Sequence, residues 1–105
     1  MSIEKRKVYG AKDLDNRIGK LSVGEFLRTW RQTEEMSLKE FGKLIGISVA
    51  NLCDIEQGRK GVSPEKAERI AKTIGVPPAL LVRLAIQEAL KSAGLKYTVE
   101  LWPAA

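Results

Sequence analysis

The segment SLKEFGKLIGISVANLCDIEQGR, Ser37–Arg59, decides the fold of this 105-residue chain. Ser37 with Glu40 three residues later is the pattern of a capping box, in which side chain and backbone satisfy each other at the start of a helix. Apolar side chains then recur at helical spacing, at Leu38, Phe41, Leu44 and Ile45. These features predict a short helix that begins after Ser37 and ends before Gly46.

A tight turn and a second short helix are predicted to follow. Gly46 can adopt the positive φ that such a turn requires. Ser48 is a suitable N-cap for the second helix, and Gly58 ends it. At 100° per residue, Leu52 and Ile55 lie on one side of this helix, with Asn51 at the margin. The opposite side carries Val49, Ala50, Cys53, Asp54 and Gln57.

Two short helices joined in this way are the arrangement of a helix-turn-helix, whose second helix enters the major groove of DNA. Leu52 and Ile55 would anchor the second helix to the first. The outward side chains at its beginning would then meet the edges of the bases.

Three further helices are predicted around this unit. Ser22 with Glu25 is another capping box, and the helix that it begins would run to about Glu35. Ser63-Pro64-Glu65 combines a cap, a proline at the first helical position and an acid in the first turn. Pro77-Pro78 precedes the apolar segment ALLVRLAIQEALKSAG, which predicts a fifth helix.

The fifth helix and the segment after it predict a dimer. The helix is apolar on more than one side, and a domain this small can cover only one of them. In LKYTVELW, residues 95–102, apolar and polar residues alternate as in a half-buried β-strand, which needs a partner strand for its backbone hydrogen bonds. The partner would be either the N-terminal arm, at IEKRKVY (residues 3–9), or the same strand of a second chain. The predicted dimer interface comprises Leu81, Leu84, Ala85, Tyr97, Val99 and Leu101.

The predicted fold is therefore all-α: a compact five-helix domain over residues 22–94, with a C-terminal β-strand extension and tail over residues 95–105, paired in a dimer. Residues 1–21 form a separate basic arm with six basic against three acidic side chains, or +3 of the net +5 of the whole chain. Lys5, Arg6 and Lys7 in this arm suit either a contact with DNA or an ordinary solubilising tail.

Composition narrows the classes of function. The chain has no His and one Cys, so neither a Cys/His zinc cluster nor an intramolecular disulfide is expected. No signal peptide, membrane span, phosphate-binding glycine loop or nucleophile–base pair is recognisable. We expect a cytoplasmic protein that is not an enzyme and has no cofactor, metal or small-molecule ligand.

Residues 22–76 resemble the lambda-repressor-like, Cro-type (XRE) helix-turn-helix family. The matching features stand in order and at the family's spacing: Gly46-Ile47-Ser48, Ile55-Glu56-x-Gly58-Arg59, Pro64 and Ile70-Ala71-Lys72. The chain departs from the family at Leu38, where members often carry Gln, and at Val49 and Ala50, which replace Arg, Gln or Lys. Val49 and Ala50 cannot hydrogen-bond to bases but can touch thymine methyl groups.

The resemblance implies two sets of contacts with DNA. The base-facing residues would be Ser48, Val49, Ala50, Asn51 and Asp54. The phosphate-contacting residues would be Ser37, Gln57, Arg59 and Lys60. Asp54 could accept a hydrogen bond from a cytosine amino group, whereas close to phosphates it would weaken binding unless it paired with a basic side chain.

The function implied is that of a homodimeric repressor bound to an inverted-repeat operator in double-stranded DNA. Small members of the family with a short C-terminal tail also resemble the antitoxins of type II toxin–antitoxin operons, which would add a toxin protein as a partner. An orphan or prophage repressor without a toxin is the other role that the resemblance implies. The alternative is a protein-interaction module that uses the helix-turn-helix scaffold without specific DNA recognition.

Overall fold

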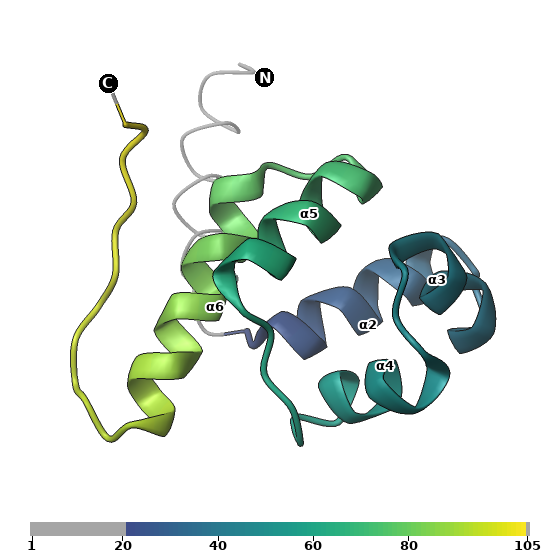
Figure 1. Cartoon of the computed structure of the whole chain (residues 1–105), viewed down its shortest axis with the longest axis horizontal. Coiled ribbons are helices and arrows are strands. Elements are labelled where there is room, and N and C mark those ends of the chain that lie inside the picture. Colours follow the sequence, from purple (N-terminus) through teal and green to yellow (C-terminus); the bar gives the residue numbers. More distant parts are fainter. Residues whose placement is uncertain (1–20, 105) are drawn as a thin grey trace, which may run out of the picture.

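The computed structural model describes residues 21–104, and this part of the chain forms five helices (Figure 1). They are α2 (Val23–Thr33), α3 (Leu38–Ile45), α4 (Val49–Glu56), α5 (Pro64–Ile74) and α6 (Pro78–Ser92). Residues 1–20 of the basic arm, with Lys5, Arg6 and Lys7, lie outside the described residues. None of the five helices combines the length and the apolar character needed to cross a membrane.

Serine side chains begin four of the five helices, as predicted. Ser22 and Ser37 form complete capping boxes with the glutamates three residues later. The hydroxyl oxygens of Ser48 and Ser63 each accept a hydrogen bond from the backbone N–H three residues on. Each cap satisfies a backbone N–H that has no partner inside the helix, and a cap of this kind typically contributes about 1 kcal/mol.

The core lies where the helices meet. The largest side chains that are fully buried come from all five helices: Val23, Leu27, Phe41, Ile45, Leu52, Ile70, Leu81 and Leu84. Burial of each such side chain stabilises the fold by about 1.5–3 kcal/mol. Helix α6 packs mainly along α5, and α2 packs against both α4 and α6. The α3–α4 pair is therefore held from behind by α2 and α5.

The predicted C-terminal β-strand is wrong. Residues 95–104 are extended but form no strand, and the described part of the chain contains no β-sheet. The Gln87 side chain takes the place of a neighbouring strand: its Nε2 donates to the Tyr97 carbonyl at 2.7 Å, and the Val99 N–H donates to its Oε1 at 2.9 Å. A side-chain amide has both a donor and an acceptor, so it satisfies two backbone groups without a second strand.

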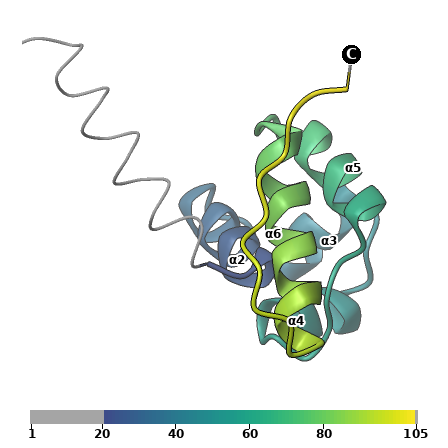
Figure 2. The same ribbon diagram turned by 90° about the vertical axis from the view of Figure 1, so that its left-hand side faces the viewer.

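This C-terminal segment also changes the argument for a partner subunit. It turns back after α6 and runs along that helix (Figures 1 and 2). Leu81, Leu84 and Ala85 are no more than 4% exposed and lie in the core of a single chain, so they offer no surface to a second one. The remaining predicted interface residues lie on the C-terminal segment, where Tyr97 is exposed and both Val99 and Leu101 are half-buried.

Candidate nucleic-acid interface

The turn between α3 and α4 has the geometry that the sequence predicted. Gly46 adopts φ 72° and ψ 35°, the left-handed conformation that glycine allows at low cost. The Ile47 N–H donates to the Gly42 carbonyl at 2.8 Å, and the Ile47 side chain is buried. Leu52 and Ile55 on α4 are also buried, which confirms them as the inward anchors. The outer face of α4 is thereby turned away from the core.

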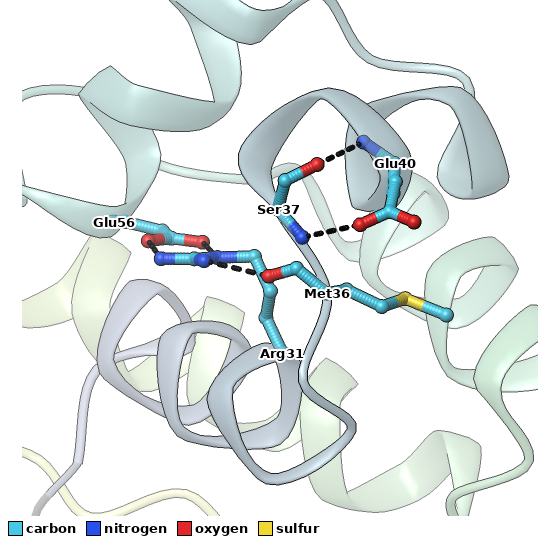
Figure 3. A network of polar contacts seen from close by, with 5 residues as sticks. All are labelled: Arg31, Met36, Ser37, Glu40 and Glu56. Atoms are coloured by element: carbon cyan, nitrogen blue, oxygen red, sulfur yellow. Dashed lines mark hydrogen bonds and ion pairs between the residues drawn. The ribbon is translucent and has the colours of Figure 1, made fainter.

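An ion pair that the sequence analysis missed joins α2 to the end of α4 (Figure 3). Arg31 Nε lies 2.8 Å from Glu56 Oε2, and its Nη2 donates to Oε1 at 3.0 Å. Arg31 Nη1 also donates to the Met36 carbonyl at 2.9 Å, in the loop before α3. The two side chains are 15% and 4% exposed, and the hydrogen bond to Glu56 raises the pKa of Arg31 above its ordinary value. This pair fixes α4 and the start of α3 against α2.

The spacing of residues along α2 could have identified Arg31 as a buried side chain. Val23, Leu27 and Arg31 are four residues apart, and the first two are fully buried. Residues with this spacing share one face of a helix, so Arg31 extends the buried stripe of α2 rather than its polar face. Glu56 follows the inward residue Ile55 and is 7% exposed.

The start of α3 carries Ser37, one of the predicted phosphate contacts. The Ser37 N–H donates to Glu40 Oε1 at 2.8 Å, and the Ser37 hydroxyl oxygen accepts from the Glu40 N–H at 3.0 Å (Figure 3). The hydrogen bond from the Ser37 backbone is the main reason why the pKa of Glu40 lies below its ordinary value. With the backbone N–H engaged, the hydroxyl proton of Ser37 is the group that can reach an outside acceptor.

The outer face of α4 begins with small and apolar side chains. Val49 is 45% exposed, and Ser48 and Ala50 beside it are exposed as well. The Ser48 hydroxyl oxygen accepts from the Asn51 N–H at 3.2 Å, so this side chain is committed to the helix cap. The start of α4 is therefore a shallow surface that can make van der Waals contact with bases.

Farther along α4, four predicted DNA-contacting residues come together. Arg59 Nε donates to Asp54 Oδ1 at 2.8 Å, and Lys60 Nζ donates to Asn51 Oδ1. The loop after α4 folds back to allow this, since the backbone N–H groups of Arg59 and Lys60 both donate to the Asp54 carbonyl, at 2.8 and 3.2 Å. Arg59 Nη2 also lies 3.9 Å from Cys53 Sγ. The hydrogen bond to Asp54 raises the pKa of Arg59 above its ordinary value.

The remaining predicted residues lie apart from this group. Gln57 is exposed at the end of α4, where its N–H donates to the Cys53 carbonyl at 2.9 Å. Ser37 belongs to the start of α3. Over residues 37–60 the formal charge is +1, from the cations of Lys39, Lys43, Arg59 and Lys60 against the carboxylates of Glu40, Asp54 and Glu56. Because Glu56 is neutralised by Arg31, the exposed part of this segment is more basic than that sum.

Comparison with known proteins agrees with this geometry. A sequence model described as a helix-turn-helix domain matches residues 22–84, which is 63 of the 105 residues of the chain. A search of curated proteins gives no match. The matched region contains all of α2 to α5 and the first half of α6. The chain therefore belongs to the helix-turn-helix domain family of DNA-binding regulators.

Proposed function

We propose that this protein is a sequence-specific transcriptional repressor that binds double-stranded DNA with α4 in the major groove. The observation that carries the proposal is the pairing of an exposed, shallow outer face at the start of α4 with two cations, Arg59 and Lys60, in the loop directly after it. A groove-binding helix needs both elements, because base edges provide specificity and phosphates provide most of the affinity.

The side chains divide between the two tasks. Val49 and Ala50 make apolar contacts with thymine methyl groups, and Asn51 and Asp54 are the hydrogen-bonding side chains of the outer face. Arg59 and Lys60 bind phosphates, with Gln57 and the Ser37 hydroxyl as additional contacts. With few direct hydrogen bonds to bases, much of the specificity comes from the shape of the DNA.

The proposal predicts that Arg59→Ala/Lys60→Ala weakens DNA binding and makes it less sensitive to salt. If each cation neutralises one phosphate, the slope of log K for binding against log salt becomes shallower by about 1.8 per bound subunit when both are removed, or by about 3.6 for a homodimer. Fluorescence anisotropy should be measured on the duplex directly upstream of the protein's own gene and on a random duplex, at several salt concentrations.

Arg28→Ala/Lys72→Ala is the matched control, because it removes two exposed cations that lie outside the segment from α3 to the loop after α4. It should leave most of the slope unchanged. If the two double variants lose affinity equally, the cations of the loop have no special role. If wild type ignores every duplex at low salt, the protein is an interaction module on a helix-turn-helix scaffold.

The functional unit in this proposal is a homodimer on an inverted repeat, with half-sites about one helical turn apart. Support comes from the large apolar side chains on the C-terminal segment, where Tyr97 is 68% and Trp102 is 83% exposed. Contact between these side chains in two copies would cover them without any pairing of strands. The same exposed side chains suit a toxin, the partner expected of a type II antitoxin.

Sedimentation velocity tests the dimer with Tyr97→Ser/Trp102→Ser. The substitutions leave the backbone carbonyl of residue 97 available to Gln87, so the C-terminal segment should stay in place along α6. We expect wild type to sediment as a dimer and the variant as a monomer at the same micromolar concentration. A variant that remains dimeric would show that these two side chains do not hold the dimer together, and a monomeric wild type would contradict the homodimer.

A further inference from the structure

We propose that Asp54 is a specificity-determining residue that acts as an electrostatic filter: it holds Arg59 in the free protein and releases it only on DNA that offers Asp54 a hydrogen-bond donor. This inference rests on the proposed function, because it concerns the same DNA-binding surface. It adds that one carboxylate suppresses binding to unrelated DNA.

The geometry of the free protein supports this role. The Asp54 carboxylate accepts from Arg59 Nε at 2.8 Å, while the Asp54 carbonyl accepts from the backbone N–H groups of Arg59 and Lys60. The loop is therefore fixed by the Asp54 backbone, independently of the side chain. The carboxylate adds only the pairing with the guanidinium, so its removal should leave the loop in place.

Asp54 has no favourable role in the helix to explain its presence. It lies in the last turn of α4, where the carbonyl end of the helix carries a partial negative charge and disfavours an acid. Its side chain is 32% exposed and that of Arg59 is 60% exposed, and an ion pair this open to solvent contributes little to stability. The position is unfavourable for folding but lies on the face that would meet the bases.

On unrelated DNA the pair between Asp54 and Arg59 stays closed, because Arg59 could reach a phosphate only by breaking the pair and by leaving an unpaired carboxylate close to phosphates. Both effects oppose that contact. On a duplex that presents a cytosine amino group to Asp54, the carboxylate accepts a hydrogen bond from the base while Arg59 moves to a phosphate. The lost ion pair is then replaced by a hydrogen bond to the base, but only on sequences that have a cytosine at this position. A group that opposes binding to all other sequences in this way produces specificity.

A second pair on the same face, between Lys60 and Asn51, is arranged in the same way, but its acceptor is a neutral amide and not a carboxylate. Lys60 Nζ donates to Asn51 Oδ1, so Asn51 gives up one acceptor to a cation of the loop in the free protein. When Lys60 moves to a phosphate, the Asn51 amide can form the two hydrogen bonds that identify adenine. In the free protein, each of the two loop cations is thus paired with a side chain of the base-facing set. When DNA binds and the cation moves to a phosphate, that side chain becomes free to contact a base.

The test is the affinity of Asp54→Ala for a random duplex, with Glu68→Ala as the matched control. Glu68 lies 3.8 Å from Lys72 on α5, so the control also removes one exposed carboxylate and releases one cation, but away from α4. We expect Asp54→Ala to bind the random duplex about two- to fivefold more tightly for each bound subunit, as expected from the strength of one exposed ion pair, and a homodimer would square this factor. Its log–log salt slope should steepen by about 0.9 for one further phosphate contact in each bound subunit, or by about 1.8 for a homodimer.

Two further measurements separate this role from a general effect of charge. In an Arg59→Ala background, Asp54→Ala should gain much less affinity, because the residue acts through Arg59. Sequencing of the DNA that each protein selects from a randomised pool should show a preference for cytosine at one position of each half-site, present for wild type and lost in Asp54→Ala.

The outcomes are distinguishable. If wild type binds DNA in a salt-dependent way but Asp54→Ala gains no more than Glu68→Ala, the filter is overturned and the proposed function stands. The filter is also overturned if the gain is as large without Arg59. If neither wild type nor Asp54→Ala binds any duplex at low salt, the proposed function fails and the filter fails with it.

Discussion

Glu56→Ala should destabilise the domain by about 3–5 kcal/mol, the usual cost of removing one partner from a buried ion pair. The Glu56 side chain is 4% exposed and accepts two hydrogen bonds from Arg31. Without it, the Arg31 guanidinium remains largely buried with the Met36 carbonyl as its other polar partner. The measurement is urea unfolding followed by far-UV circular dichroism.

Glu68→Ala is again the control, since the Glu68 side chain is 53% exposed and forms a surface pair with Lys72. It should change the free energy of unfolding by less than about 1 kcal/mol. If the two alanine variants are equally stable, the pair between α2 and α4 does not hold the fold together.

Arg31→Met/Glu56→Leu tests the cause of the effect. Replacement of both charges by apolar side chains removes the buried charge as well as the pair, and such replacements are often neutral or stabilising. The double variant should therefore recover most of the stability that Glu56→Ala loses. A double variant as unstable as Glu56→Ala would show that the shape of the pair matters more than its charge.

The sequence predicted the helices well because each one begins with a local signal. The capping boxes of Ser22 and Ser37 depend on residues only three positions apart, and the left-handed turn at Gly46 depends on one glycine. These signals act within one turn of a helix, so a single sequence carries them completely.

The C-terminal segment was predicted wrongly because its partner is distant in sequence and of an unexpected kind. Alternation of apolar and polar residues at 95–102 is typical of a strand, and the sequence contains no signal for a side chain that replaces the neighbouring strand. Gln87 does so across 10 and 12 positions of sequence. The same segment lies along α6, which removed the argument for covering that helix with a second chain (Figure 2).

The candidate site was predicted in composition but not in arrangement. Family resemblance named Asn51, Asp54, Arg59 and Lys60 as contacts of DNA, in separate roles. The contacts among these four residues depend on how the loop after α4 folds back on the Asp54 carbonyl. The side-chain pairs lie five and nine positions apart and follow from the path of the backbone through the loop, which a residue pattern does not specify.

Gly24→Ala should destabilise the domain by about 3 kcal/mol, at the upper end of the usual cost of overpacking. A Cβ at Gly24 would lie 1.9 Å from the Ile55 carbonyl oxygen, 2.8 Å from the Ile55 carbonyl carbon and 3.2 Å from Glu56 Cα. All three are backbone atoms, so no change of rotamer relieves the clash, and α2 and α4 must separate. Alanine recovers at most about 1 kcal/mol from its better helix propensity.

Gly61→Ala is the matched control, because its Cβ would meet no atom within 4 Å. Urea unfolding should show this control to be within about 1 kcal/mol of wild type, since alanine in an unstrained loop position stabilises slightly or has little effect. Equal stability of the two variants would mean that α2 and α4 are not in the close contact that requires glycine.

The effects of Gly24→Ala and Glu56→Ala on stability should also be coupled. Gly24 approaches Ile55 and Glu56, and Glu56 carries the ion pair to Arg31, so both substitutions disrupt one contact between α2 and the end of α4. When two substituted residues belong to one contact, their effects on the free energy of unfolding do not add. Gly24→Ala/Glu56→Ala should therefore lose less than the sum of the single variants, because a helix already displaced by residue 24 has less of the ion pair to lose. Simple additivity would mean that the glycine contact and the ion pair hold α4 independently.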